Sequence, residues 1–281
     1  LHCICQKEDN LMYKLIVCSV DDTLLTNNHT LSEDTKEALL QAQQAGARLA
    51  LISRRSPQNL KKIAEKLQMN TYKGYIAACH GAFLQEMGSE RVLRKKEVSL
   101  KLVDRIKALA EGQDVTLSIV ENGCLYASGI DPYVQLEALL NDMRLCPWEA
   151  FEDISDTVLK LYVTGESSAL NGFISWMPKT LEEEIKLIRS GRNMCSIVHG
   201  DVDKGTALQC IMQDMGIQKE DVLLIADSTN DKAMAPYAGC VSVMANAEDE
   251  VRRDAAFLTH SNECDGIVRT LEVLTQDVEV I

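Results

Sequence analysis

The stretch LIVCSVDDTLL, residues 15–25, decides the fold that we expect for this chain. Its first part, Leu15 to Cys18, is apolar and short, as in a buried β-strand. A serine, Ser19, and the polar run DDT at 21–23 follow directly. In parallel sheets, ligands bind beyond the carboxyl ends of the strands. We therefore predict a functional site at the end of this first strand.

The composition is that of an ordinary globular chain. It has 281 residues, of which 46% are hydrophobic and 25% charged, enough for one large domain or two smaller ones. The net charge of −13, with no basic block, argues against nucleic acid or an anionic membrane as a partner. The ten cysteines are scattered without a C-x-x-C pair, and no run of about 18 apolar residues could span a bilayer. We therefore expect reduced cysteines and a cytoplasmic location.

The first residues stand apart from the rest. The segment LHCICQKEDNL, residues 1–11, is too short and too charged for a signal peptide. Met12 is a candidate for the natural start. We expect residues 1–11 to be a leader or extension outside the fold.

Apolar runs alternate with helical patterns along two parts of the chain. Ser32 and Ser56 have the character of helix N-caps, and Gly46 ends the first helical pattern. The expected strands lie at 15–18, 47–53, 74–79, 221–227 and 240–245, and the expected helices at 32–46, from 56 onward, at 203–216, 247–256 and 264–276. This order predicts an α/β fold with a Rossmann-like core, in which crossover helices join the strands of a parallel sheet.

The pattern changes between residues 85 and 190. There the segments VTLSIV, CLYASG and VLKLYVTG alternate more strongly between apolar and polar residues. Such alternation is typical of a sheet with one exposed face. We predict an inserted α+β cap domain over 85–190, with the core domain formed by 12–84 and 191–281.

Three polar clusters should meet at one edge of the core sheet. Ser19–Thr23 and Ser53 end the first two strands, and Asp227–Asp231 follows a late strand. Lys204 begins a helix, where positive charge favours anion binding. Carboxylates, hydroxyls and an ammonium together suit magnesium-assisted phosphoryl chemistry. The candidate metal ligands are Asp21, Asp227 and Asp231, although DSTND alone would more often be a turn.

Other common phosphate or hydrolase motifs are absent. Lys204 precedes Gly205, the reverse of the order in a P-loop, and no G-x-G-x-x-G follows the first strand. No G-x-S-x-G appears, so Ser19 is not the nucleophile of an α/β-hydrolase elbow. Neither acidic cluster has the spacing of a calcium loop.

Five separated segments carry a resemblance to a known family: MYKLIVCSVDDTLL, LALISRRSPQNL, YIAACHGAFL, DKGTAL and the long stretch from IADSTND to CDGI. In this order they resemble the motifs of the Cof-type phosphatases of the haloacid dehalogenase superfamily. The resemblance covers the chain from Met12 onward. It implies a cytoplasmic, magnesium-dependent hydrolase of small phosphorylated metabolites, with an α/β core and a mobile α+β cap.

The resemblance also implies roles for individual residues. The family's first motif, D-x-D-G-T, falls on residues 19–23, so that its nucleophilic Asp is Ser19 here. Asp21 matches the general acid/base, whose backbone carbonyl also binds the metal in relatives. The remaining matches are Ser53 and Lys204 for phosphate binding, and Asp227 and Asp231 for the acidic pair of the last motif, with Asn230 beside them.

Several positions depart from the family pattern. Asp22 and Arg54 stand where relatives have Gly, His80 where they have Asn, and Ala226 where they have Gly. Glycine permits a positive φ or a close backbone approach, and Asp tolerates a positive φ better than Arg does. We therefore count Asp22, Arg54 and His80 among the residues that line the altered site.

Ser19 is the change with the largest chemical consequence. An aspartyl phosphate is a reactive anhydride, whereas a phosphoserine is an unactivated ester that water opens slowly. Two functions remain open: a phosphatase of reduced or lost activity, or a non-catalytic protein that binds a phosphorylated metabolite. Whether Ser19 is natural or engineered also remains open, and the sequence predicts neither the substrate nor the oligomeric state. Lys204→Ala is expected to weaken phosphate binding without unfolding the chain.

Overall fold

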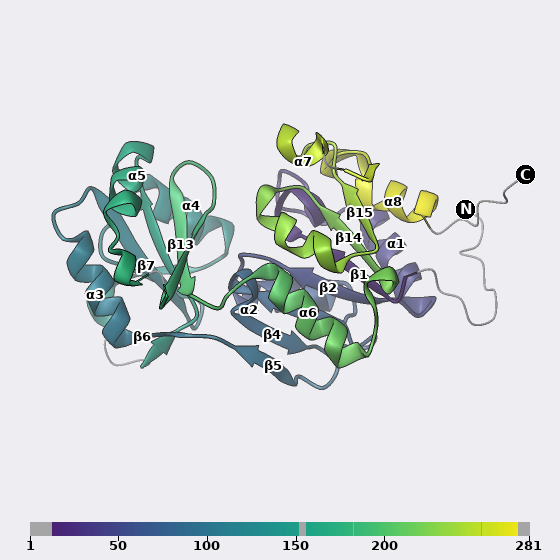
Figure 1. Ribbon diagram of the computed structural model, residues 1–281, viewed down its shortest axis with the longest axis horizontal. Coiled ribbons are helices and arrows are strands. Elements are labelled where there is room, and N and C mark those ends of the chain that lie inside the picture. The colour runs from purple at the N-terminus through teal and green to yellow at the C-terminus, as the bar shows by residue number, and fades with distance from the viewer. Residues whose placement is uncertain (1–12, 152–155, 182, 254, 275–281) are drawn as a thin grey trace, which may run out of the picture. The chain divides into compact units, whose positions relative to one another are not determined.

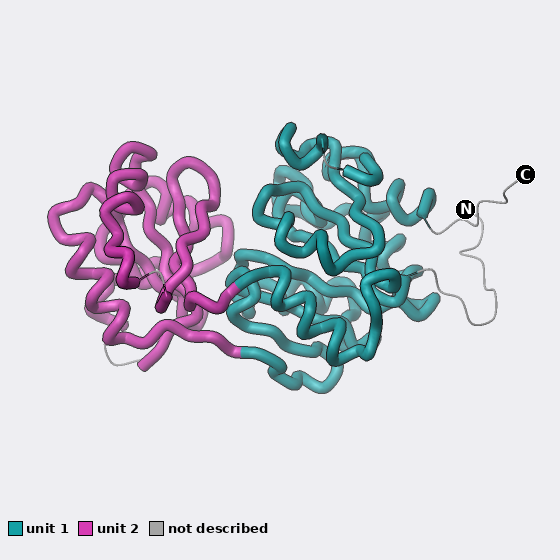
Figure 2. The backbone as a smooth tube through the Cα atoms, in the orientation of Figure 1, with its two compact units in different colours: residues 1–94, 203–281 teal, residues 95–202 magenta. Residues whose placement is uncertain are grey.

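The computed structural model describes residues 13–151, 156–181, 183–253 and 255–274. These divide into two compact units, which Figure 2 distinguishes by colour. The first unit combines the chain up to residue 94 with the chain from 203 onward, and the second spans 95–202. Residues 1–11, which we expect to be a leader, lie outside the described residues.

The boundaries of the insert differ from the predicted 85 and 190. The strands β4 (Phe83–Glu86) and β5 (Val92–Lys95) continue the core sheet, with β4 antiparallel to β3 (Tyr75–Ala78). At the other end, β13 (Met194–His199) pairs with β11 (Leu161–Gly165) inside the second unit. The boundaries differ because β4 and most of β5 belong to the first unit, and because β12 (Ile185–Arg189) and β13 belong to the second unit, so that the chain returns to the first unit only just before α6 (Lys204–Met215).

The core sheet has eight strands in the order β16-β15-β14-β1-β2-β3-β4-β5. Neighbouring strands are parallel from β16 through β3. The strands not yet given are β1 (Leu15–Cys18), β2 (Arg48–Ile52), β14 (Val222–Ala226), β15 (Cys240–Val243) and β16 (Phe257–Leu258). The predicted α/β fold with a parallel-sheet core is confirmed.

The helices of this unit begin where their capping residues predict. Ser32 precedes α1 and accepts a hydrogen bond from the Thr35 backbone N–H at 3.1 Å. Ser56 precedes α2 and accepts one from the Asn59 N–H at 3.3 Å. The helices are α1 (Glu33–Gln44), α2 (Pro57–Lys66), α6 (Lys204–Met215), α7 (Asp249–Arg253) and α8 (Gly266–Leu274). Short helical turns are η1 (Val20–Leu24), η2 (Cys79–Gly81), η5 (Lys219–Asp221), η6 (Thr229–Tyr237) and η7 (Asn262–Cys264).

Apolar packing covers the faces of the sheet. Leu15 and Val17 on β1 share one core cluster with Leu208 and Ile211 on α6, the green helix in front of β2 in Figure 1. Ile16 between them is also buried, and alternation along the strand directs it to the opposite face. With both faces packed, the edge where the parallel strands end is where Ser19, Ser53 and Asp227 are placed.

The second unit is an α+β unit with its own core. Its six-stranded sheet has the order β12-β13-β11-β7-β8-β9, in which only β8 and β9 pair in parallel among the registers described. Its further elements are β6 (Val98–Ser99), α3 (Leu100–Ala110), β7 (Val115–Glu121), β8 (Cys124–Ala127), α4 (Pro132–Leu140), β9 (Arg144–Pro147), η3 (Trp148–Phe151), β10 (Thr157–Val158), α5 (Ser167–Trp176), η4 (Lys179–Leu181) and β12 (Ile185–Arg189). Within the described part of the chain, no helix of either unit is long and apolar enough to cross a membrane.

Candidate active site

The register of the core sheet brings three polar segments to adjacent strand ends. Cys18 of β1 pairs with Leu51 of β2 on one side and with Ile225 of β14 on the other. The backbone N–H of Ser19 still donates to the carbonyl of Ile225, at 3.2 Å. The chain therefore turns polar at Ser19, Ser53 and Asp227 as these three neighbouring strands end.

The turn after β1 has the backbone that the sequence pattern implies. Asp22 has a φ of +58°, in the left-handed region that Asp enters more readily than most residues. The Asn246 side chain donates to the Asp22 carbonyl at 2.7 Å. Asp22 thus keeps the conformation that a glycine would adopt there, and its side chain is exposed.

Ser53, Arg55 and His80 are linked through the backbone at the end of β2. The Ser53 hydroxyl accepts from the Arg55 N–H at 3.2 Å, and the Ser53 carbonyl accepts from the His80 N–H at 2.9 Å. His80 is buried with a φ of +61°. Arg54 is not among the described residues with a positive φ, so a side chain at this position requires no left-handed backbone.

Lys204 and Asp231 form a buried ion pair. The Lys204 Nζ lies 2.6 Å from Asp231 Oδ1, and both side chains are at least nine-tenths buried. The Ser228 hydroxyl donates to the other oxygen of Asp231 at 3.0 Å. A Cβ on Gly205 would lie 2.1 Å from the Ala233 carbonyl oxygen, so only glycine allows α6 to approach η6 closely enough for this pair.

Asp227 is a buried carboxyl beside a second acid. The Thr23 hydroxyl donates to its Oδ1. Burial, followed by the charge of Asp231, raises the pKa of Asp227 to about 7, although Thr23 and Lys204 oppose the shift. Near neutral pH its negative charge is therefore costly, and a cation close to it would be stabilising.

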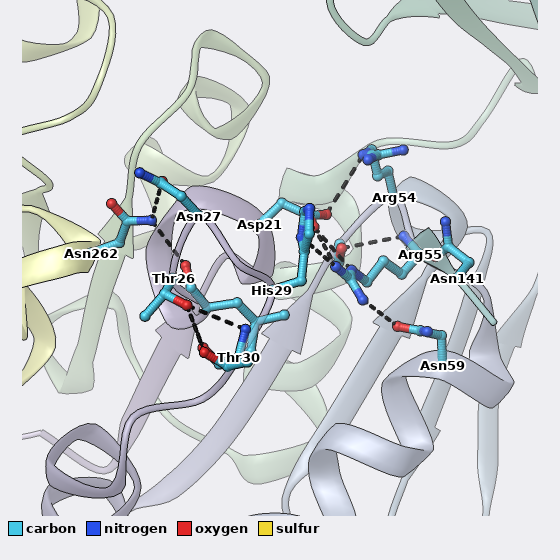
Figure 3. Close-up of polar contacts among 12 residues, drawn as sticks. Asp21, Thr26, Asn27, His29, Thr30, Arg54, Arg55, Asn59, Asn141 and Asn262 are labelled. Carbon is cyan, nitrogen blue, oxygen red and sulfur yellow. Dashed lines mark hydrogen bonds and ion pairs between the residues drawn. The ribbon is translucent and has the colours of Figure 1, made fainter. Parts of the chain in front are cut away.

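Asp21 is held by basic side chains, as Figure 3 shows. Its Oδ1 accepts from the Arg55 Nε at 3.0 Å and Nη2 at 2.6 Å, and its Oδ2 lies 3.6 Å from the Arg54 Nε. His29 Nδ1 lies 3.8 Å from Oδ1. Burial alone would raise the pKa of the Asp21 carboxyl, but the Arg55 hydrogen bonds and the charges of Arg54, Arg55 and His29 hold it below its ordinary value.

The sequence analysis missed three residues of this arrangement. Arg55 was not named although it follows Arg54 directly, and Thr23 was placed in the polar cluster after the first strand but was given no role of its own. His29 comes from a loop, and no sequence pattern marks it. Asn230, which the resemblance placed beside the acidic pair, is exposed. The remaining expected residues lie on strand ends, η1, η2, α6 and η6, as described above.

Few side chains at this edge could bind a magnesium ion, but those present offer the oxygen ligands that it prefers. No group of three or more His, Cys, Asp or Glu side chains in the described ranges is arranged to hold a metal. Asp231 is engaged by Lys204, and the Asp21 side chain by the arginines. The buried Asp227 carboxylate and the backbone and hydroxyl oxygens around it are hard ligands of the type that magnesium prefers. These residues fit a weakly held ion.

The comparisons with known proteins identify the family. The chain belongs to the haloacid dehalogenase-like hydrolase family, which it matches over residues 16–271. It is 26% identical to YxeH of Bacillus subtilis over 267 residues, which cover 94% of this chain and 98% of YxeH. It is 24% identical to 5-amino-6-(5-phospho-D-ribitylamino)uracil phosphatase YcsE of the same species, over 95% of this chain and 97% of YcsE.

Solved structures agree with this assignment. A haloacid dehalogenase-like hydrolase from Bacteroides thetaiotaomicron superposes with a TM-score of 0.87 at 27% identity, covering 93% of this chain and 99% of that one. TM0651 from Thermotoga maritima shares the fold with a TM-score of 0.81 at 21% identity, over 95% and 99% of the two chains. The match extends over both units of the present fold.

The raised pKa of Asp227 predicts a pH-dependent stability. The unfolded carboxyl has its ordinary pKa of 3.8, so between that value and about 7 the folded state binds more protons. This contribution is complete below pH 3.8 and is lost as the pH rises through 7. Asp227→Asn should therefore gain stability over the parent protein, by about 1–4 kcal/mol, on going from pH 4 to pH 8 without magnesium.

Urea unfolding of both proteins across this pH range measures the difference. Asp34→Asn is the control, because it removes an exposed carboxylate from α1 of the same unit. An equal pH dependence for Asp227→Asn and the parent protein would show that Asp227 ionises in the folded chain as it does in water.

Proposed function

We propose that this chain binds small phosphorylated metabolites at the rim formed by Ser19, Ser53 and Lys204, and that it is a phosphatase by descent whose hydrolysis is impaired at Ser19. The observation that carries the proposal is the buried pair of Lys204 and Asp231 beside the strand ends. An ammonium held at the start of α6, together with serine hydroxyls, is the donor set that a phosphate requires.

Each residue has a definite task in this proposal. Lys204 and Ser53 bind the phosphate oxygens, and the Asp231 carboxylate orients the Lys204 ammonium. The Ser19 hydroxyl has the position of the nucleophile that attacks the phosphorus atom. Attack from Ser19 requires loss of its proton, and it would leave a phosphoserine that water hydrolyses slowly. Transfer of the phosphoryl group to Ser19 is therefore less impaired than the hydrolysis of the resulting phosphoserine.

We also propose that magnesium binds weakly, at the Asp227 carboxylate and the Asp21 carbonyl. When bound, the ion would offset the negative charge of the buried carboxyl and of the phosphate oxygens. The replacement of a carboxylate by Ser19 removes one hard ligand, which is the reason for the low affinity.

A second function, binding without turnover, is favoured by the state of Asp21. A general acid must hold a proton at the working pH, and a general base must be free to accept one. The Asp21 carboxyl has a lowered pKa and accepts two hydrogen bonds from Arg55. In this arrangement it serves neither role, and the site binds a phosphate without turning it over.

Calorimetry with glycerol 3-phosphate tests the proposed site. Ser53→Ala should weaken binding by about tenfold or more, because a hydrogen bond to a charged group contributes about 1.5–3 kcal/mol. Ser242→Ala is the control, since Ser242 is equally buried on β15 and bonds to Thr270. Release of inorganic phosphate with magnesium present then separates the two functions. Equal affinity of the two variants would place the phosphate elsewhere.

A further inference from the structure

Two cysteines and an arginine lie together near one edge of the sheet in the second unit. Cys124 begins β8, directly after the exposed residues 122 and 123. The neighbouring strand, β9, carries Arg144 and Cys146. In the parallel pairing of these strands, Arg144 is level with Cys124, and Cys146 is level with Tyr126. Because side chains two positions apart on a strand share a face of the sheet, all four point to the same side.

The Arg144 guanidinium is positioned to stabilise a thiolate at Cys124. Its Nη2 donates to the Cys124 Sγ at 3.3 Å. Burial alone would raise the pKa of this thiol, but hydrogen bonds from Arg144, Cys146 and Tyr126, together with the charge of the arginine, hold it below its ordinary value. The thiolate is the nucleophilic form of cysteine, so a larger share of Cys124 is reactive near neutral pH than of an isolated thiol.

The Cys124 sulfur lies close to the surface of its unit. Cys124 itself is 5% exposed, whereas Arg144, which bonds to it, is an exposed residue on the edge strand β9. Residues 122 and 123, which precede Cys124, are exposed as well. A small movement of the Arg144 side chain would therefore open the sulfur to a molecule as small as a hydroperoxide.

We propose that Cys124 is a site of reversible oxidation by hydroperoxides, and that Arg144 holds its thiolate ready for the reaction. The thiolate sulfur attacks the terminal peroxide oxygen, so that an S–O bond forms and the O–O bond breaks. The leaving hydroxide or alkoxide is protonated by the solvent, the sulfur is oxidised to a sulfenic acid, and the peroxide is reduced. Two molecules of a small thiol return Cys124 to its reduced form, giving their disulfide and water. The site lies in the second unit, and this inference does not depend on the proposed function.

A disulfide between Cys124 and Cys146 is not the expected product. The two residues are one strand apart and two positions apart along the strands. This offset places their Cα atoms about 8 Å apart, beyond the roughly 7 Å that a disulfide can bridge without movement of the backbone. We therefore expect a limited dose of peroxide to leave a sulfenic acid at Cys124, with Cys146 as a neighbour that stabilises the thiolate.

Labelling with dimedone after a limited dose of hydrogen peroxide tests the inference. Dimedone adds to sulfenic acids, and peptide mass spectrometry then measures each cysteine separately. Cys264 is the internal comparison, because it is exposed. We expect Cys124 to be labelled at least about fivefold faster than Cys264 although it is more buried, because oxidation follows the thiolate fraction. Dithiothreitol added before dimedone should prevent the labelling.

Variants of Arg144 separate its charge from its packing. Arg144→Gln should slow the labelling of Cys124 by about threefold or more, without a change at Cys264. Arg144→Lys keeps the positive charge and should recover most of the rate. Arg91→Gln is the control, because it removes an exposed arginine from the other unit, and it should change neither rate. Thermal unfolding verifies that each variant is folded, and the comparison of the two cysteines in the parent protein carries the test if Arg144→Gln is not.

Three results would overturn the inference. If Cys124 is labelled no faster than Cys264, exposure rather than the thiolate decides reactivity, and Cys124 is not a preferred site. If Arg144→Gln is folded and labels Cys124 as fast as the parent protein, Arg144 does not prepare the thiolate. If peroxide links Cys124 to Cys146 and only Cys146→Ser yields the dimedone adduct, the proposed product is wrong.

Discussion

Ser19→Asp is expected to raise the hydrolysis of p-nitrophenyl phosphate at least about a hundredfold over the parent protein in the presence of magnesium. Under the proposed function, the variant supplies a carboxylate nucleophile, a metal ligand and an acyl-phosphate intermediate that water can open. Loss of the nucleophile costs about 10⁶-fold in the worked example of subtilisin, so even a partial recovery is measurable.

The gain should depend on the divalent cation. Ser19 is buried at the strand end next to β14, and Asp227 nearby already has a raised pKa because of burial and Asp231. A further carboxylate adds like charge to a desolvated place. Without magnesium we expect Ser19→Asp to be less stable than the parent protein and inactive, and with magnesium we expect both properties to recover.

Ser19→Asn is the matched control, because it has the size of aspartate without its charge or nucleophilicity. It should remain as inactive as the parent protein with or without magnesium. If Ser19→Asp is folded and binds magnesium yet shows no gain, then Asp22, Arg54 or His80 also disables the site and the binding function is favoured. A parent protein as active as Ser19→Asp would contradict our account of Ser19.

Lys204→Ala is expected to destabilise the fold by about 3–5 kcal/mol, the usual cost of breaking a buried ion pair by removing one partner. Asp231 is 1% exposed and would lose its cationic partner in Lys204→Ala. Adding Asp231→Asn to Lys204→Ala should recover most of this loss, because the unpaired charge is then absent. Urea unfolding of the single and double variants measures both effects.

Lys36→Ala is the control for the loss of a lysine. Lys36 pairs with Glu33 on the exposed side of α1, and such a pair contributes less than about 1 kcal/mol. If Lys204→Ala were no more destabilising than Lys36→Ala, the Lys204–Asp231 pair would not be a structural element. Phosphate affinity is best measured in the double variant, where loss of binding is not confused with loss of folding.

The expectation that Lys204→Ala leaves the fold intact was made from the helix alone, without its ion pair with Asp231. The apolar face of the helix was visible in the sequence, and α6 indeed packs through Leu208 and Ile211. The partner of Lys204 lies 27 positions further along the chain. Their contact depends on the approach of α6 to η6 at Gly205, which no local pattern specifies.

Local rules were sufficient for the elements of the core. The caps at Ser32 and Ser56, the buried strand at 15–18 and the polar residues after it follow from periodicity and hydrogen-bonding chemistry within a few residues. The parallel orientation of neighbouring strands follows from the crossover helices that join them. The sequence by itself therefore determined the fold class and the edge of the sheet at which these polar residues lie.

Tertiary structure alone decided how the charges at that edge are paired. Arg55, 34 positions from Asp21, neutralises it, and Thr23 donates to Asp227 across 204 positions. The tertiary structure also places the ends of the inserted unit at 95 and 202 instead of the predicted 85 and 190. The reason is that β4 and β13 pair with strands whose identity the sequence does not specify. Charge pairing and strand pairing act through space between distant residues, whereas capping and periodicity act along the chain.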